Sequence, residues 1–203
     1  MTAATILNIR DSISNLFPME LVRPAYQHLA SYIRALERGW SADNIRGAEA
    51  AADELAQVRA DPEAFFASLE DREAKGAPVK LPDGTFANRI PGFRRWLWDG
   101  AFAGYISLRW VPGTSDLPLH CLGHVGYAVV PWKQGKEYAT RALALILPEA
   151  KAVGLPYVEV TTDPGNFASR HVIEANGGVL IEEFIKPHQF GSKPGLRYRI
   201  GLE

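Results

Sequence analysis

The chain has 203 residues, a hydrophobic fraction of 47% and a formal net charge of -1. These values fit one globular domain with a sizeable core, and they exclude wholesale disorder and a strongly basic nucleic-acid-binding surface. The single cysteine excludes an internal disulfide, no apolar run is long enough for a membrane span, and Arg10 and Asp11 break any signal-peptide pattern. We therefore expect a cytoplasmic protein that binds neither nucleic acid nor membrane.

The first strand candidate, residues 20–23, comes directly after Met19. The residues before it carry only a partial helical stripe of apolar side chains, which is typical of a partly ordered tail. We therefore expect residues 1–18 to be an N-terminal extension and residues 19–203 to form the domain.

The remainder of the first half predicts helices followed by a hairpin. Apolar residues at helical spacing indicate three helical segments, over residues 26–36, 42–58 and 64–75. Proline and glycine mark residues 80–92 as a loop. Asp99-Gly100, between the strand patterns 93–98 and 102–111, is a strong hairpin signal.

The second half alternates between strands and helices. The pattern predicts a strand at 124–130, a helix starting near Tyr138, a strand at 157–162, a helix at 167–175, and closing strands at 180–185 and 196–202. This alternation favours parallel strands joined by right-handed crossovers.

The turn before the helix at Tyr138 is suited to holding a pyrophosphate. The first N–H groups of a helix lack internal partners, and the helix dipole places partial positive charge there. Gly135 lets the backbone approach a ligand, and Lys136 adds a positive charge. Taken alone the signal is weak, because many helices begin in this way facing only water.

Two motifs resemble the GNAT acetyltransferase superfamily. Residues 134–139, QGKEYA, are similar to its pyrophosphate fingerprint (Arg/Gln)-x-x-Gly-x-(Gly/Ala), except that Glu137 stands at the central glycine. Residues 166–169, NFAS, are similar to the Asn-x-x-Ser helix of the branch that includes ribosomal-protein N-terminal acetyltransferases. The resemblance covers about residues 124–180.

The resemblance implies an α/β protein with a single GNAT-like acyl-CoA N-acyltransferase fold, a mixed central sheet and helices on both faces. Residues 123–131 and 156–162 are then expected to be neighbouring parallel strands that diverge at their C-terminal ends. It implies acetyl transfer from acetyl-CoA, without a metal, to a primary amine of a small molecule or of a protein or peptide. Exposed sheet edges also allow a homodimer. The residues implied to bind acetyl-CoA are Val129, Val130, Gln134, Gly135, Lys136, Glu137, Tyr138, Ala139, Thr140, Asn166 and Ser169.

For the general base, His124 is the first candidate. An imidazole with a pKa of roughly 6.5 accepts protons at neutral pH, and the resemblance places this strand beside the thioester. Glu159 on the neighbouring strand is the second candidate. Both residue types are also ordinary occupants of a sheet, where a histidine is hydrogen-bonded and inert.

The general acid, which would protonate the departing CoA thiolate, is harder to assign. Many family members carry a tyrosine for this role at the position that Ile173 fills here, so this sequence has no tyrosine at that position. Ser169 is a candidate to hydrogen-bond the CoA sulfur, although a serine there also serves as a helix cap. Tyr127 and Tyr198 are alternatives, but both are typical of packed strand residues.

Other chemistries fit poorly. His120, Cys121 and His124 resemble a zinc pattern, but a strand would point Cys121 away from the histidines, and no further Cys/His pair completes four ligands. The acceptor pocket is expected from the helical first half, the loop at 80–92 and the loop after Ile185. Two further functions stay open: a CoA-binding or sensing protein without catalysis, because of Glu137, and an enzyme that uses a longer acyl-CoA.

Overall fold

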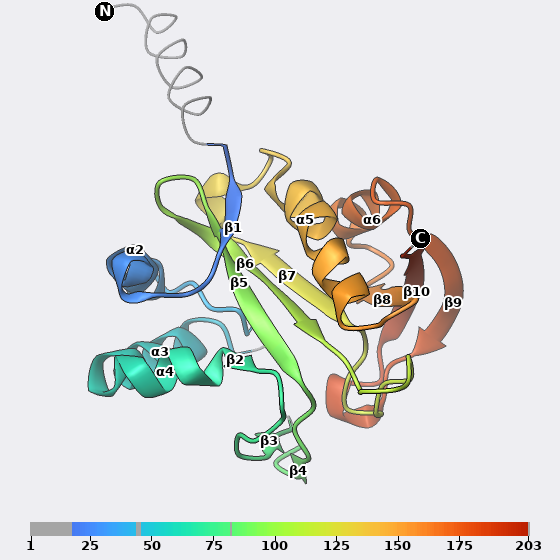
Figure 1. Ribbon diagram of the computed structural model, residues 1–203, viewed down its shortest axis with the longest axis horizontal. Helices are drawn as coiled ribbons and strands as arrows, with labels where there is room; N and C mark the ends of the chain where they lie inside the picture. The colour runs from blue at the N-terminus through green and yellow to red at the C-terminus, as the bar shows by residue number, and fades with distance from the viewer. Residues whose placement is uncertain (1–17, 44–45, 82, 203) are drawn as a thin grey trace, which may run out of the picture.

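The computed structural model describes residues 18–43, 46–81 and 83–202. The extension predicted at residues 1–18 therefore lies outside the described residues, apart from Pro18. Two β-sheets lie side by side, with helices packed on both sides of the first sheet (Figure 1). None of the described helices is long and apolar enough to cross a membrane.

The first sheet contains the predicted hairpin. Its strands neighbour one another in the order β1 (Glu20–Val22), β5 (Gly92–Trp98), β6 (Phe102–Arg109) and β7 (Val125–Val129), and short β2 (Glu70–Asp71) pairs with β5. All these pairs are antiparallel. Gly100 at the hairpin tip has a φ of 91°, a value that glycine tolerates and other residues rarely adopt.

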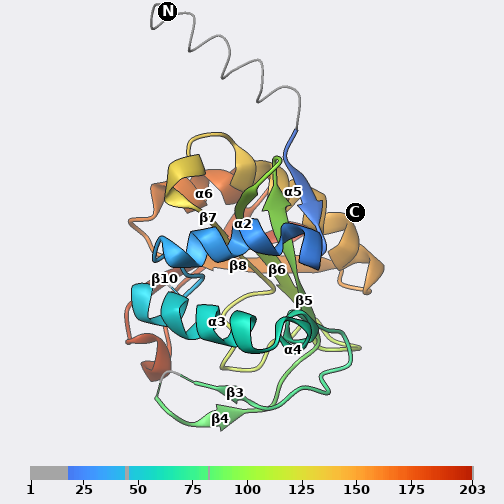
Figure 2. The ribbon, with the colours of Figure 1, turned by 90° about the vertical axis from the view of Figure 1, so that its left-hand side faces the viewer.

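Three helices from the first half cover one face of this sheet: α2 (Tyr26–Glu37), α3 (Ala48–Ala60) and α4 (Pro62–Ser68) (Figure 2). Their aromatic side chains pack against the sheet, and Tyr32 stacks on Trp96 with ring centroids 4.4 Å apart. The predicted boundaries need correction, since α3 begins only at Ala48 and α4 ends at Ser68. Asp61 sets the start of α4, because its carboxylate accepts the N–H of Ala64.

The opposite face is covered by α5 (Tyr138–Ala152), which follows β7 after the short 3-10 helix η1 (Pro131–Lys133). Leu143 and Ile146 of α5 are fully buried in the core on this side. The expected strand, turn and helix are therefore confirmed here.

The second sheet closes the domain. Its strand order is β8 (Tyr157–Thr162), β10 (Pro194–Gly201), β9 (Val179–Ile185), and both pairings are antiparallel. α6 (Phe167–Glu174) connects β8 to β9, η2 (His188–Phe190) lies before β10, and a small hairpin of β3 (Val79–Lys80) and β4 (Phe86–Ala87) lies within the predicted loop. The α/β class and the helices on both faces are confirmed. The expected parallel ladder is not found, because every strand pair among the described residues is antiparallel and the sheet is divided between β7 and β8.

Candidate active site

The division between the sheets is bridged by His124, which immediately precedes β7. Its backbone N–H donates to the Glu159 carbonyl on β8 at 2.8 Å, and its ring Nδ1 accepts the Glu159 N–H at 2.9 Å. No strand ladder joins β7 to β8 in the described ranges. The two strands therefore meet at this point and leave the next part of the β7 edge without a partner strand.

The pairing with β6 determines which β7 groups face this gap. Arg109 N–H donates to the His124 carbonyl at 2.9 Å and Val130 N–H donates to the Ala103 carbonyl at 3.0 Å. In an antiparallel pair alternate residues bond to the neighbour, so the backbone groups of Tyr127 and Val129 point away from β6. Of the two predicted valines, Val129 directs its N–H to the gap while its carbonyl accepts the Gln134 side-chain amide at 3.3 Å, whereas the N–H of Val130 is already bonded to β6.

His124 is fully buried, and its environment keeps the ring neutral. Burial lowers the pKa of His124, and Arg109 lowers it further, although the charge of Glu159 acts in the opposite direction. The lone pair of Nδ1 is used by the Glu159 N–H, so the proton of the neutral ring resides on Nε2. Proton acceptance by His124 would require this hydrogen bond to open.

The carboxylate of Glu159 is held by two arginines of β10. Arg197 donates to it at 3.0 Å and Arg199 at 2.7 Å. These guanidinium groups occupy lone pairs of its oxygens and form ion pairs with it. The structure therefore brings both predicted bases together, His124 and Glu159, with each already engaged in hydrogen bonds.

Tyr127 and Ser169 meet on the other side of β7. The Tyr127 hydroxyl lies 2.9 Å from the Ser169 hydroxyl and 3.3 Å from its carbonyl oxygen. Burial raises the pKa of Tyr127 to about 12, with the Ser169 hydrogen bond acting in the opposite direction, so the phenol is a proton donor at neutral pH. Our sequence reasoning treated Tyr127 as a packing residue, because nothing in a strand pattern shows that its ring reaches α6.

Asn166 acts as the cap of α6. Its side-chain oxygen accepts the N–H of Ser169 at 3.1 Å. The alternative expectation made the Ser169 hydroxyl the cap, but Asn166 takes that role, and the Ser169 hydroxyl contacts Tyr127 instead. The motif therefore has a structural role here in addition to the predicted contact with the CoA sulfur, which stays a prediction.

The start of α5 is different, because it has no side-chain cap among the described residues. Gln134, Gly135, Lys136 and Glu137 lie at the surface, in the turn that leads to it. The first backbone bond of the helix runs from Arg141 N–H to the Glu137 carbonyl, which leaves the amides of the first turn available. A 15-residue helix with free amides and a neighbouring lysine is suited to a phosphate group.

Glu137 occupies the glycine position of the fingerprint in a left-handed conformation, with a φ of 57° and a ψ of 15°. Glycine adopts this conformation at little cost, whereas other residues lose about 1–2 kcal/mol. The Glu137 carboxylate accepts a hydrogen bond from the Thr140 hydroxyl at 2.9 Å, so it folds back over the first turn of α5. The exposed side chain thus lies beside the predicted phosphate site.

A partly buried carboxylate of the β5–β6 hairpin anchors this turn. Asp99 accepts hydrogen bonds from the Tyr138 hydroxyl at 2.7 Å and from the Lys133 ammonium. Burial alone would raise the pKa of Asp99, but the bonds from Lys133 and Tyr138 outweigh it and hold the pKa below its usual value. Only the hairpin turn was evident from the sequence, so the role of Asp99 was missed.

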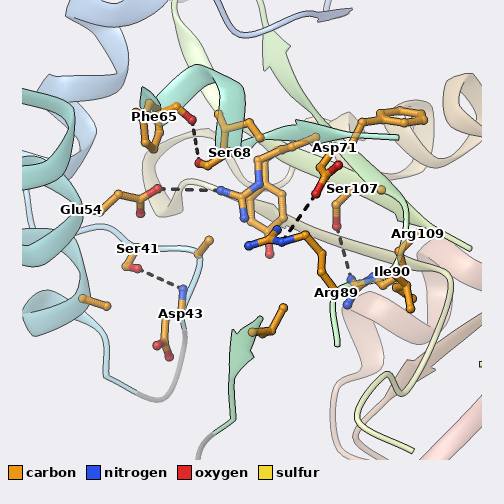
Figure 3. A pocket seen from close by; sticks show the side chains of 18 of the residues that line it. Ser41, Asp43, Glu54, Phe65, Ser68, Asp71, Arg89, Ile90, Ser107 and Arg109 are labelled. Carbon is orange, nitrogen blue, oxygen red and sulfur yellow. Dashed lines mark hydrogen bonds and ion pairs between the residues drawn. The ribbon is translucent and has the colours of Figure 1, made fainter. Parts of the chain in front are cut away.

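A cavity of about 650 Å³ lies between α3, α4 and the β5–β6 face of the sheet (Figure 3). It is lined by polar residues from both sides, and the loop at 80–92 contributes Arg89 and Ile90. The loop after Ile185 instead borders a second cavity of about 500 Å³, which Glu159 also lines. His120 and Cys121 border the first cavity, but the described residues contain no group of three metal-ligating side chains.

Comparison with known proteins gives a sequence match and a set of structural matches. A sequence model of the acetyltransferase (GNAT) domain matches residues 44–179. No curated protein matched the sequence.

Three solved structures illustrate the structural likeness. The ribosomal L7/L12 alpha-N-protein acetyltransferase RimL, in complex with coenzyme A, has a TM-score of 0.56 at 13% identity, covering 91% of this chain and 96% of its own. The microcin C7 self-immunity acetyltransferase MccE, in complex with acetyl-CoA and AMP, has a TM-score of 0.53 at 13% identity, covering 90% and 92%. The protein yncA from Salmonella typhimurium, with acetyl-CoA, has a TM-score of 0.50 at 14% identity, covering 91% and 94%. At these identities the likeness shows the fold alone.

Proposed function

This chain belongs to the GNAT acetyltransferase family, and we propose that it transfers the acetyl group of acetyl-CoA to a primary amine bound in the 650 Å³ cavity. The observation that carries the proposal is the uncapped start of α5 beside the unpaired edge of β7. A strand edge and a helix start together offer what a long thioester with a diphosphate needs: backbone groups along its arm and amides at its phosphates.

The proposed donor site follows these features. Gln134, Gly135 and Lys136 and the first-turn amides of Tyr138, Ala139 and Thr140 would hold the diphosphate, and the backbone of Val129 would hold the arm between the sheets. Asp99 fixes the turn from behind through Lys133 and Tyr138. Tyr127 and Ser169 would then lie near the sulfur, where the resemblance places Ser169.

In the proposed reaction, the neutral amine nitrogen attacks the thioester carbonyl carbon. A C–N bond forms, the C–S bond breaks, and the amine gives up one proton while the CoA thiolate gains one. The protonated Tyr127 hydroxyl is our candidate to supply the proton to sulfur. His124 and Glu159 stay the candidates to receive the amine's proton, directly or through water, and their existing hydrogen bonds favour a water relay.

One observation favours a second candidate function. The Glu137 carboxylate places negative charge next to the predicted phosphate site, which suits a protein that binds CoA weakly and senses it without turnover. A third candidate is transfer from a longer acyl-CoA. Action in the cytoplasm and pairing of two copies through exposed strand edges also stay proposals; the outer strand β9, which exposes Val179 and Ile185, supports the latter.

A thiol-release assay tests the proposal. The protein is supplied with acetyl-CoA or longer acyl-CoAs and with a panel of small amines and peptides, while calorimetry measures acetyl-CoA binding. We expect binding together with amine-dependent release of CoA from acetyl-CoA. Binding without release from any amine supports the sensor, preferential release from longer donors supports the third candidate, and absence of binding contradicts the proposed donor site.

A further inference from the structure

One arginine in the cavity, Arg109, has no carboxylate partner among the residues that the structure describes. The other three cavity arginines each lie 2.9 to 3.9 Å from a carboxylate: Arg46 from Asp43 and Asp53, Arg89 from Asp71, and Arg94 from Glu54. Within the described ranges, the side chain of Arg109 makes one hydrogen bond, to the Ser107 hydroxyl at 3.4 Å. A single hydrogen bond to a neutral hydroxyl does not balance the charge of a partly buried guanidinium. Arg109 is therefore suited to bind an anion from outside the chain.

The position of Arg109 directs this charge toward the β7 strand. Arg109 ends β6 and lies opposite His124, so both side chains project from the same face of the sheet. Its guanidinium lies over Gly126, because a Cβ built on that glycine would be 2.7 Å from the Arg109 Nη2 atom. Gly126 immediately precedes Tyr127, and successive strand residues are about 3.4 Å apart. The ring of Tyr127 leaves the opposite face of β7, so an anion on Arg109 and the proposed proton donor would lie on opposite sides of the strand, with the arm of the proposed donor at the strand edge between them.

From this geometry we propose that Arg109 binds a carboxylate of the acceptor, and that the acceptor is a small amine whose carboxylate lies only a few bonds from its amino group. The inference rests on the proposed function, because it concerns the acceptor of that reaction. The planar fork of an arginine matches the two oxygens of a carboxylate, and holding that group fixes the amine relative to the thioester. Arg109 lies over Gly126, directly beside the strand edge proposed for the arm of the donor, and this closeness favours a small zwitterion over the chain end of a large protein.

The test compares matched acceptors on matched variants. The common α-amino acids are assayed for acetyl-CoA-dependent thiol release beside their carboxamides, their decarboxylated amines and short peptides. For the wild type we expect kcat/KM to be at least about tenfold higher for an amino acid than for its carboxamide. Arg109→Gln should remove this preference by lowering kcat/KM for the amino acid about 100-fold. Its effect on the carboxamide should stay below about threefold.

Two further variants separate binding from folding. Gly126→Ala keeps the arginine but displaces its guanidinium, and it should also weaken the preference for the carboxylate. Arg89→Gln removes a cavity arginine that already has a carboxylate partner, and it should affect both acceptors equally. Melting temperature and the acetyl-CoA Kd are measured for each variant, and both should stay near the wild-type values for Arg109→Gln.

The outcomes distinguish this inference from the proposed function. If acetyl-CoA binds but no amino acid is acetylated, whether or not neutral amines or peptides are, the inference about Arg109 is wrong. The proposed donor site is not contradicted by that result. The same conclusion follows if Arg109→Gln lowers kcat/KM equally for both members of a pair. Failure of the wild type to bind acetyl-CoA contradicts the proposed function itself.

Discussion

The ring of His124 takes the place of a strand backbone for Glu159, because its Nδ1 atom accepts the N–H that a neighbouring carbonyl would otherwise receive. The strands β7 and β8 are thus joined by one backbone bond and one side-chain bond at the point where the sheets part. The Glu159 N–H of β8 is thus hydrogen-bonded although no continuous sheet joins the two strands. Variants of His124 can therefore distinguish a residue that positions β8 from one that acts as the general base.

Replacing His124 with asparagine separates these two roles. Asparagine keeps a side-chain acceptor for the Glu159 N–H but cannot titrate. If His124 is the base, kcat falls by roughly 100-fold and the acidic limb of the pH–rate profile disappears. Because the Nδ1 lone pair is already used, we expect the limb to persist and kcat to fall less than about tenfold. His124→Ala, which leaves the Glu159 N–H unpaired, should cost about 1–3 kcal/mol of stability in urea unfolding.

The lowered pKa of His124 predicts a pH dependence of stability. The unfolded chain has an imidazole pKa of about 6.5 and so binds the proton more readily than the folded protein does. The free energy of unfolding is therefore highest, as far as His124 is concerned, above about pH 6.5. It decreases as the pH falls through that value toward the pKa of His124 in the folded protein. In urea titrations this loss should be smaller in His124→Asn. His28, whose pKa burial also lowers, is present in both proteins and cancels in the difference.

Tyr127→Phe tests the proposed acid. Removing the hydroxyl should lower kcat by about 10- to 100-fold, at the low end of acid catalysis because a thiolate is a good leaving group. Acetyl-CoA binding, measured by calorimetry, should change little. No basic limb of the pH–rate profile should arise from Tyr127 below about pH 11, given its pKa of about 12.

Tyr198→Phe is the matched control for the acid. Tyr198 is also a strand tyrosine that reaches α6, where its hydroxyl donates to Glu174 at 3.0 Å. Its loss should affect stability and leave kcat unchanged. Equal losses of kcat in the two variants would assign both tyrosines to packing.

Glu137→Gly and Glu137→Gln distinguish backbone strain from charge at the proposed phosphate site. The glycine variant relieves the left-handed strain and removes the carboxylate, whereas the glutamine variant removes only the charge. We expect acetyl-CoA to bind about three- to tenfold more tightly to both, because the exposed charge is largely screened. A gain above 100-fold would show that the carboxylate faces the phosphates, and weaker binding would count against a phosphate site.

Asp99→Asn tests the anchor of the turn. The change removes the charge that holds Lys133 and weakens the bond from Tyr138. We expect the acetyl-CoA Kd to rise about tenfold, with kcat at saturating donor nearly unchanged. Because the folded pKa of Asp99 lies below its usual value of about 3.9, its contribution to stability is present above that pH and is lost in acid. A lower kcat with unchanged Kd would contradict a role in donor binding.

The sequence predicted the local structure of the candidate site. The strand, the turn and the start of the helix at Tyr138 were predicted because their signals follow one another along the chain. The contact between Tyr127 and Ser169 was not, since the two residues are 42 positions apart and meet only through the packing of α6. Asp99 was recognised as a turn residue, but its bonds to Lys133 and Tyr138 depend on where the hairpin tip lies in space.

The division of the sheet could be predicted only in part. The resemblance implies strands that diverge at their C-terminal ends, but the β-branched patterns of β7 and β8 are the same whether the strands pair along part of their length or meet at one point. The side chain of His124 holds β8 at that point, and a hydrophobic pattern does not encode such a contact. The left-handed Glu137, by contrast, was detectable as a departure from the family's glycine.

Two helices begin beside the gap between the sheets, and they are not equivalent: Asn166 occupies the start of α6, whereas the start of α5 is open. A polyanionic chain entering the gap therefore finds one end that accepts its charge and one that does not. For the proposed donor, this asymmetry favours a single direction, with the nucleotide at α5 and the reactive end toward Tyr127. If the donor binds in this way, its orientation is set before any acceptor binds, and the proposed acceptor cavity needs to serve only one of the two orientations.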